Sequence, residues 1–273
     1  MKLASLDTCV RRLTFQDIPS ALILSALAGW NQTAADWRLL LDLHPEGCLG
    51  IECAGRVVAT TTLICYEDQL AWLGMVLTHP DYRNQGFARR LVERALELAA
   101  NKNMRSVKLD ATRQGRPLYE SLGFREEQPV QRWSGAVVRS HAICLPMIGH
   151  PDFHLDREAF GVNRSEVLQR LAAEQPAFVM EDGFAMWRTG SRASYLGPCV
   201  AASSATAKLL IAKCLGCGPR RWYWDLLPSN RDAVAMAREL GFQLDRTLFR
   251  MVKGFDIRGK ESMIYAGGGF ELG

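Results

Sequence analysis

The chain has 273 residues, which is enough for roughly two domains. Hydrophobic residues make up 48% and charged residues 23%, a globular composition that excludes intrinsic disorder. No apolar run approaches the ~18 residues of a membrane helix, and the start of the chain lacks the apolar core of a secretory signal. The net charge of +4 is spread without a basic stripe. We therefore expect a cytoplasmic protein with no nucleic-acid and no membrane partner.

The eight cysteines lie mostly within apolar stretches, and we expect reduced thiols buried as small hydrophobic side chains. They are Cys9, Cys48, Cys53, Cys65, Cys144, Cys199, Cys214 and Cys217. The lone CxxC at 214–217 is predicted to end a helix before Gly218, so packing is favoured over a redox role. The five histidines are scattered, and nothing supplies the converging ligands of a structural zinc site, so we expect no metal.

Apolar periodicity and turn residues predict helices and strands throughout the first half. In chain order these are a strand and a helix within 10–27, a helix over 30–43, strands over 50–52, 57–66 and 72–78, a helix over 86–100, a strand over 106–110, a helix over 116–122 and a strand over 130–138. The turns at 55–56 and 68–69 are short, which indicates an antiparallel meander. The order implies a mixed α/β sheet.

The second half repeats nearly the same order. Its predicted elements are a helix over 162–173, strands over 177–180, 185–188 and 193–200, a helix over 205–214, a strand over 222–226, a helix over 231–240 and a strand over 247–252. Leu122-Gly123-Phe124 recurs as Leu240-Gly241-Phe242, an offset of 240 − 122 = 118. The same offset carries Pro80 to Pro198 and Arg132 to Arg250. Several matches at one gap-free offset indicate a duplicated domain.

The segment from Val76 to Arg90 carries the strongest chemical signal. A strand ends near Pro80, a loop containing Arg83 and Gly86 follows, and a helix begins. Helix N-termini present unpaired N–H groups and a positive dipole to phosphate, and glycine lets an anion approach the backbone closely. Arg89 and Arg90 fall in the first helical turn, where cations oppose the dipole, a conflict that a bound anion would resolve. The alternative is a solvated helix start with basic residues.

Two motifs resemble those of GNAT acetyltransferases. Arg83-x-x-Gly86-x-Ala88, after a strand that ends in His79-Pro80, resembles the pyrophosphate loop of this family. The stretch PLYESLGF over 117–124 resembles the second half of its signature. The resemblance is strong over about 10–145 and weaker beyond. It implies an α/β (α+β) fold of two tandem GNAT-like domains, catalytic over 8–145 and degenerate over 150–273, each a mixed, mostly antiparallel sheet flanked by helices.

The resemblance also implies acetyl-CoA as co-substrate and assigns roles to individual residues. The residues expected to contact the cofactor are Val76, Leu77, Thr78, Arg83, Asn84, Gln85, Gly86, Phe87, Ala88, Arg89 and Thr112. Residues 76–78 would hold the pantetheine arm through backbone groups, as an added strand does, and 84–89 would wrap the pyrophosphate. Tyr119 would protonate the departing thiolate, a reasonable task for a phenol hydrogen-bonded to sulfur. The alternative for Tyr119 is a packed aromatic on a short helix.

Four further residues lie outside the two motifs. Thr112 stands where the family often has Asn, and its hydroxyl replaces only one of the two amide contacts. Asp110 is a candidate for the base that deprotonates the amine; it could equally cap the following turn, with a water chain serving as base. Trp30 and Asn31 lie between the first two predicted helices and are candidates for acceptor binding. Their alternative is a core Trp beside a helix N-cap.

The second copy lacks the motif residues. Offset 118 carries Arg83 to Ala201, Gly86 to Ser204, Ala88 to Thr206 and Tyr119 to Ala237. It carries Thr112 to Asn230, so the second copy has the asparagine that the family often has at this cofactor position. A lone asparagine before a helix is more typical of an N-cap. We expect this domain neither to bind coenzyme A nor to catalyse, and instead to complete the acceptor pocket or brace the first domain.

The sequence thus predicts an N-acetyltransferase that moves the acetyl group of acetyl-CoA to an amine by direct attack, without a metal. Two alternatives remain, a non-catalytic acyl-CoA sensor and a scaffold that binds a protein partner. The acceptor is a small-molecule or peptide amine of open identity, and the oligomeric state is open too.

Overall fold

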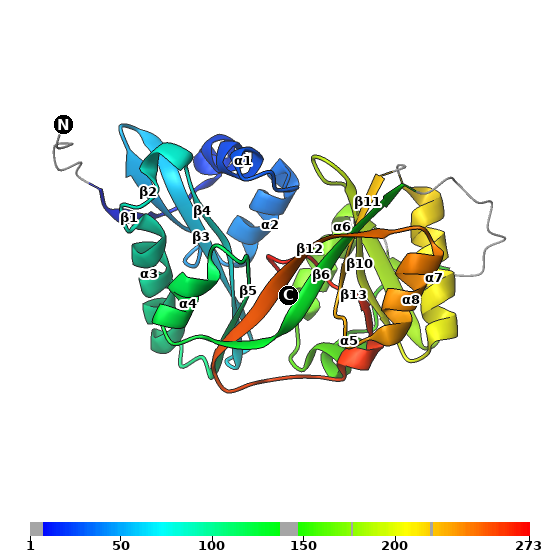
Figure 1. Ribbon diagram of the computed structural model, residues 1–273. Coiled ribbons are helices and arrows are strands. Elements are labelled where there is room, and N and C mark those ends of the chain that lie inside the picture. The colour runs from blue at the N-terminus through cyan, green and yellow to red at the C-terminus, as the bar shows by residue number, and fades with distance from the viewer. Residues whose placement is uncertain (1–7, 137–146, 176, 219–220) are drawn as a thin grey trace. The chain divides into compact units, whose positions relative to one another are not determined.

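The computed structural model describes residues 8–136, 147–175, 177–218 and 221–273 (Figure 1). It forms two compact units, residues 1–107 and 108–273, and the chain passes from one to the other within a strand. Both units are α+β, with mostly antiparallel pairing and helices packed on the strands. Within the described ranges no helix is long and apolar enough to cross a membrane.

Unit 1 is an antiparallel meander with helices packed against it, as predicted. Its strands pair in the order β1 (Val10–Arg12), β2 (Leu49–Cys53), β3 (Arg56–Tyr66) and β4 (Leu70–Thr78). Its helices are η1 (Phe15–Asp17), α1 (Ile18–Leu27), α2 (Ala34–Leu43), η2 (Pro80–Tyr82) and α3 (Phe87–Asn101). The apolar stripe of α3 is buried, which explains why this helix packs against β3 and β4.

Helix α2 starts four residues later than predicted. Thr33 is its N-cap, and the side chains of Thr33 and Asp36 form a reciprocal capping box. The box satisfies two N–H groups that a helix start leaves unpaired, so the helix begins at Ala34 and not at Trp30. The suggested N-cap beside Trp30 is therefore Thr33 and not Asn31.

Unit 2 contains a longer sheet, in the order β5-β12-β6-β11-β10-β9-β8-β7, with β13 beside β10. The strands are β5 (Ser106–Ala111), β6 (Arg125–Ala136), β7 (Met147–Gly149), β8 (Ala177–Met180), β9 (Gly183–Arg188), β10 (Ser194–Ala201), β11 (Arg221–Leu226), β12 (Gln243–Gly254) and β13 (Ile264–Ala266). The helices are α4 (Arg116–Ser121), α5 (Phe153–Phe160), α6 (Ser165–Glu174), α7 (Ser204–Cys217), α8 (Arg231–Glu239) and η3 (Glu261–Met263). Helices α7 and α8 lie side by side (Figure 1).

Several elements of unit 2 differ from prediction. The helix expected over 162–173 is α6, which begins three residues later than predicted. Helix α5 was not predicted; Asp152 caps its start, and Gly161, in the left-handed region, ends it. Strand β6 begins at Arg125, five residues earlier than expected, since it pairs with β12 along its length. The short strands β7 and β13 were not predicted. Cys144, residues 137–138 of the strand predicted over 130–138 and the predicted domain end at 145 lie outside the described residues.

The predicted burial of the cysteines holds for four of the seven that the structure describes. Cys48, Cys53, Cys199 and Cys214 are buried and Cys65 is partly buried, but Cys9 and Cys217 are exposed, contrary to expectation. Cys217 is the last residue of α7, so the CxxC ends a helix as predicted. Burial raises the pKa of the Cys214 thiol well above its ordinary value, which leaves it protonated at neutral pH and supports a packing role.

The final strands of the two repeats are exchanged within unit 2. Each repeat contributes a strand, a helix and a last strand, namely β5-α4-β6 in the first copy and β11-α8-β12 in the second. Strand β6 pairs antiparallel with β11, and β12 neighbours β5. Arg132 on β6 makes two hydrogen bonds to Asp225, at 2.7 and 2.6 Å, and Arg250 on β12 makes two to Asp110, at 2.9 and 3.0 Å. Equivalent arginines thus clamp an aspartate of the other copy.

These ion pairs correct the repeat register. The two aspartates are 225 − 110 = 115 residues apart, and so are the N-caps of α4 and α8, Gly115 and Asn230. Helix α8 has nine residues where α4 has six, and these three extra residues restore the offset of 118 beyond the helices. Asn230 therefore corresponds to Gly115 and not to Thr112, and its side chain accepts a hydrogen bond from the Ala233 N–H as an N-cap.

Replacing Arg132 tests how much the ion pair between the two copies contributes to stability. The side chains of Arg132 and Asp225 are only 2% and 4% exposed, so Arg132→Leu leaves a buried carboxylate without its counter-charge. We expect the free energy of unfolding to fall by about 3–5 kcal/mol in urea denaturation. Lys208→Leu is the control, because its ion pair with Glu239 is exposed and should contribute less than about 1 kcal/mol. Equal effects of the two substitutions would contradict the buried clamp.

Candidate functional site

A bulge interrupts β4 just before the residues predicted to hold the pantetheine arm. The register between β3 and β4 shifts between Thr60 and Thr62, and Met75 lies at φ +50°. The Thr60 hydroxyl donates to the Met75 carbonyl at 2.8 Å, and the Thr61 hydroxyl donates to the Gly74 carbonyl at 3.2 Å. These side-chain bonds satisfy carbonyls that the bulge removes from the ladder. Val76 lies in the irregular stretch, and pairing with β3 resumes at Leu77.

The loop between β4 and α3 makes two left-handed turns, at Asn84 and Gly86. Gly86, at φ +77°, is the N-cap of α3, and no side chain caps this helix start. A Cβ at Gly86 would meet no atom within 4 Å, so the space in front of the helix is open. Rings of His79, Tyr82 and Phe87 pack in series and fix the base of the loop. The loop residues from Arg83 to Gly86 are exposed.

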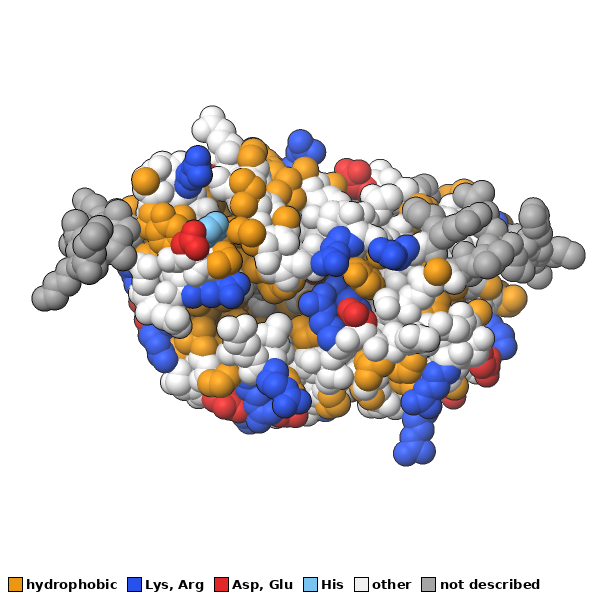
Figure 2. All heavy atoms as spheres, turned by 45° about the horizontal axis from the view of Figure 1, so that its top comes forward, with side chains coloured by type: hydrophobic (Ala, Val, Ile, Leu, Met, Phe, Trp, Pro, Cys, Tyr) orange, Lys and Arg blue, Asp and Glu red, His pale blue; other side chains and the backbone are white. Residues whose placement is uncertain are grey.

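The basic residues near the loop are less available than the sequence suggested. Arg90 donates to the Thr8 carbonyl at 2.6 Å and to its hydroxyl at 2.9 Å, and Arg89 lies 3.6 Å from Glu93. These partners offset the conflict with the helix dipole without a bound anion. Arg83 is exposed and makes a long bond of 3.4 Å to the Thr78 carbonyl. Figure 2 shows Lys and Arg side chains in separate groups among hydrophobic and uncharged surface.

The unit 1 residues fit an acyl-CoA in two places. The N–H groups at the start of α3 and the open space at Gly86 suit a diphosphate. On β4, the Thr78 hydroxyl oxygen is buried, and no group in the described part of the chain hydrogen-bonds it. A buried polar atom without a partner costs free energy, and a ligand amide could satisfy it.

The predicted acceptor residues lie on the connection between α1 and α2. The Trp30 N–H donates to the Ser25 carbonyl at 2.8 Å, and the Trp30 side chain is half-buried. Asn31 is fully buried. The core tryptophan of this region is instead Trp37, whose indole donates to the Ser25 hydroxyl at 3.3 Å. Trp30 thus retains surface for a ligand, whereas an acceptor can reach Asn31 only if its cover moves.

Unit 2 holds the predicted acid. Tyr119 on α4 is 7% exposed, and its ring packs edge-to-face on Phe124 with centroids 5.9 Å apart. A Cβ at Gly115 would lie 3.3 Å from the Tyr119 ring, so glycine leaves room for it. Burial raises the pKa of the Tyr119 phenol well above its ordinary value. The phenol therefore remains protonated at neutral pH, which is the state a proton donor needs.

The other two predicted residues lie just before α4, Asp110 on β5 and Thr112 in the turn that follows the strand. Thr112 is exposed, and its hydroxyl accepts a hydrogen bond from the Gly115 N–H at 3.1 Å while keeping its own proton to donate. Thr112 therefore caps this turn, the role considered as an alternative for Asp110. The Asp110 carboxylate is instead enclosed, and Arg250 binds both of its oxygens.

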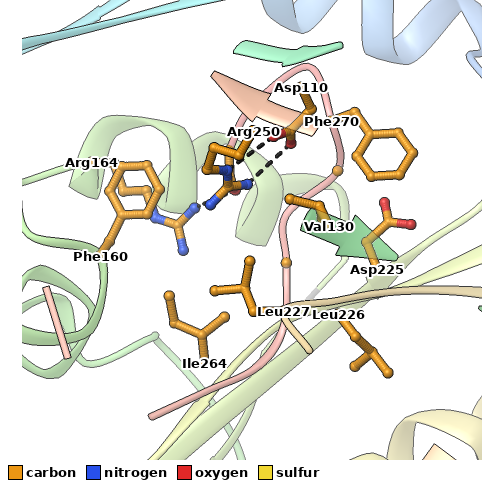
Figure 3. Close-up of a pocket in the computed structure, with 13 residues that line it drawn as sticks. Asp110, Val130, Phe160, Arg164, Asp225, Leu226, Leu227, Arg250, Ile264 and Phe270 are labelled. Carbon is orange, nitrogen blue, oxygen red and sulfur yellow. Dashed lines mark hydrogen bonds and ion pairs between the residues drawn. The ribbon is translucent and has the colours of Figure 1, made fainter. Parts of the chain in front are cut away.

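Asp110 lines a pocket of unit 2 that the sequence did not predict (Figure 3). Its empty volume is about 380 Å³, open solvent included. The apolar walls are Val130, Phe160, Leu226, Leu227, Ile264 and Phe270. Two arginines reach the pocket, and each has an acidic partner: Arg250 turns to Asp110, and Arg164 makes two bonds of 2.9 Å to Asp156. Two sequence signals fall in this region, the candidate base Asp110 and the recurrence of Arg132 as Arg250.

Two family models match the chain, one in each half. A model described as "Acetyltransferase (GNAT) family" matches residues 18–124, and one described as "Acetyltransferase (GNAT) domain" matches residues 153–266. The chain belongs to the GNAT acetyltransferase family and carries two GNAT domains. The first match includes both motifs on which the resemblance rested, and the second confirms that the repeat is a GNAT domain in its own right.

Relatives of this GNAT protein match it over most of its length. It is 26% identical over 253 residues to a Bacillus subtilis (strain 168) protein named "Uncharacterized N-acetyltransferase YitH", covering 86% of this chain and 87% of that one. A Pyrococcus horikoshii crystal structure with an acetyltransferase designation superposes with a TM-score of 0.88 at 21% identity, covering 100% and 99%. The structure of a tandem GNAT protein from the clavulanic acid biosynthesis pathway superposes with a TM-score of 0.64 at 15% identity, covering 91% of this chain and 98% of that one. The two structures establish the shared fold.

Proposed function

We propose that this GNAT protein transfers the acetyl group of acetyl-CoA to an amine by direct attack in a ternary complex. The observation that carries the proposal is the start of α3, where Gly86 opens an uncapped helix N-terminus to an anion. Backbone groups of 84–89 would bind the diphosphate. Val76, Leu77 and the unpartnered hydroxyl of Thr78 would hold the pantetheine arm beside the β4 bulge.

The chemical step needs a polarised thioester, a neutral amine and a proton for the leaving thiolate. Backbone N–H groups would polarise the carbonyl, and holding both reactants in one site would supply much of the acceleration. Tyr119 would give its proton to sulfur, because its phenol stays protonated and its ring is fixed against Phe124. The acetyl group passes from sulfur to nitrogen, and the thiol and the amide are the products.

Binding and turnover, measured side by side, separate this function from its two alternatives. We expect calorimetry to show acetyl-CoA binding and a thiol-release assay to show thioester cleavage that depends on an added amine. The amine panel should include polyamines, amino sugars, amino acids and peptides with free N-termini or lysines. Binding without amine-dependent thiol release would favour an acyl-CoA sensor. Absence of binding would favour a scaffold.

Asp110→Asn tests the proposed base. Arg250 holds the Asp110 carboxylate in one orientation, and the substitution removes the basic oxygen while keeping the side chain's size. We expect turnover to fall by about 100-fold or more while acetyl-CoA affinity stays near that of the wild type. Arg250→Met is the comparison variant: it keeps the carboxylate but removes its buried counter-charge, so its free energy of unfolding is measured beside its turnover. Turnover of Asp110→Asn within threefold of wild type would leave the base role to water.

A further inference from the structure

In the second copy, the two parallel strands that correspond to β4 and β5 separate partway along. Strands β10 and β11 pair over 194–196 and 222–224 and no further. Beyond that point β10 pairs antiparallel with β13, with Cys199 opposite Ala266 and Val200 opposite Ile264. A third segment of the same chain has therefore entered beside β10 where the strands separate.

The entering segment, residues 264–267, is bonded on its other side to β11. The indole N–H of Trp224 donates to the Tyr265 carbonyl at 2.8 Å. The Gly267 N–H donates to the Asp225 carbonyl at 2.9 Å. An extended peptide thus lies between β10 and β11 and meets the hydrogen-bonding groups of both.

Close packing and buried charge hold this segment and the residues after it. A Cβ at Gly197 would lie 2.1 Å from the Gly267 carbonyl oxygen, so only glycine permits the approach. Arg188 donates to the Gly268 carbonyl at 2.8 Å and to the Glu271 carboxylate at 2.6 Å. Residues 264–266 and 271–273 are buried. The glycine-rich tail is therefore part of the core.

The helix start of the second copy is also filled by the chain's own groups. Helix α7 corresponds to α3, and its N-cap Ser203 accepts a hydrogen bond from the Thr206 N–H. The Thr206 hydroxyl in turn donates to the Asp182 carboxylate at 2.7 Å. A carboxylate and a capping hydroxyl thus stand where α3 offers an uncapped start and the open space at Gly86. Negative charge at this place would repel a diphosphate.

We propose that residues 264–267 are the permanent occupant of the second copy's acyl-CoA cleft, so that the chain binds one acyl-CoA. The inference rests on the proposed function, because it equates this cleft with the one assigned to acetyl-CoA at residues 76–78. A pantetheine arm carries two amide groups on an extended chain, and an extended peptide offers the same donors and acceptors to a separated strand. The peptide is covalently attached and buried, so a free ligand cannot displace it.

Hydrogen exchange measured with and without acetyl-CoA tests the occupant directly. In the free protein we expect peptides covering 262–273 and 195–201 to exchange slowly, with no change on adding saturating acetyl-CoA. Peptides covering 74–90 should become protected. Calorimetry should give one acetyl-CoA per chain, and Gly86→Glu should reduce this to none. Faster exchange of 262–273 with acetyl-CoA, two sites per chain, or one site remaining in Gly86→Glu would overturn the proposal.

Substitutions at two glycines test the close contact between Gly197 and Gly267. Gly197→Ala places a methyl group against the Gly267 carbonyl, and we expect exchange of 262–273 to speed up about tenfold or more. Gly241→Ala is the control, since Gly241 also has positive φ but its Cβ would meet no atom within 4 Å. Equal exchange in the two variants would contradict the wedged segment. If acetyl-CoA fails to bind at all, the proposed function fails, while exchange of 262–273 in the free protein still decides whether the segment is a fixed occupant.

Discussion

Gly86→Glu is expected to abolish measurable acetyl-CoA binding. The new carboxylate would stand at the start of α3, in the space that the diphosphate is proposed to fill, and would repel it while competing for the same N–H groups. We expect affinity in calorimetry to fall by about 100-fold or more. Folding should survive, because an acidic side chain near a helix N-terminus is favourable and the space is open.

Gly241→Glu provides the matched control. Gly241 has φ +78° against +77° at Gly86, and an added Cβ meets no atom within 4 Å at either position. The two variants therefore carry the same backbone strain and the same charge, and only the first places that charge at the proposed phosphate site. Binding that survives Gly86→Glu, or that is lost equally in both variants, would remove the loop from the cofactor site.

Tyr119→Phe is expected to lower turnover by about 100- to 10,000-fold, because it removes the proton donor for the thiolate. The phenylalanine ring keeps the edge-to-face packing on Phe124, so stability should change little. Affinity for acetyl-CoA should stay near that of the wild type. Steady-state kinetics checks the loss of turnover, and calorimetry on the same preparation checks the unchanged affinity. Unchanged turnover across the pH range would show that the proton comes from elsewhere.

The raised pKa of Tyr119 also predicts the alkaline behaviour. An acid acts in its protonated form, and burial moves the loss of this proton above the ordinary phenol pKa of about 10. Turnover should therefore show no fall caused by Tyr119 up to about pH 10. A contradicting result would be a fall in wild-type turnover centred below pH 9 that is absent from the residual activity of Tyr119→Phe. It would show that the Tyr119 phenol loses its proton below its ordinary pKa.

Local signals in the sequence predicted unit 1 well. The meander follows from short turns between apolar strands, and the buried stripe of α3 repeats at helical spacing. The α5 helix was missed because its start depends on a single cap, Asp152, and its burial depends on distant strands. Strand β13 has only three residues, and its pairing with β10 is a long-range contact that no local pattern encodes.

The candidate site divides in the same way. The Gly86 turn and the start of α3 could be identified locally, because a glycine before an amphipathic helix has a defined backbone meaning. The partners of Arg90 and Asp110 could not be identified locally. The Arg90 contact spans 82 positions of the sequence and the Asp110 contact spans 140. The repeat register also misled at Asn230, where three extra residues in α8 shift the match from Thr112 to Gly115.

Accounting for the acetyl group tests the central claim most directly. The protein is incubated with acetyl-CoA and the amine panel, and free thiol, acetylated amine and intact protein mass are measured together. Direct attack predicts one thiol released for each amine acetylated, no thiol release without amine and no acetyl adduct on the protein. Acetyl-CoA that binds yet keeps its thioester with every amine class, or an acetylated protein that forms before the amine is added, would contradict the account.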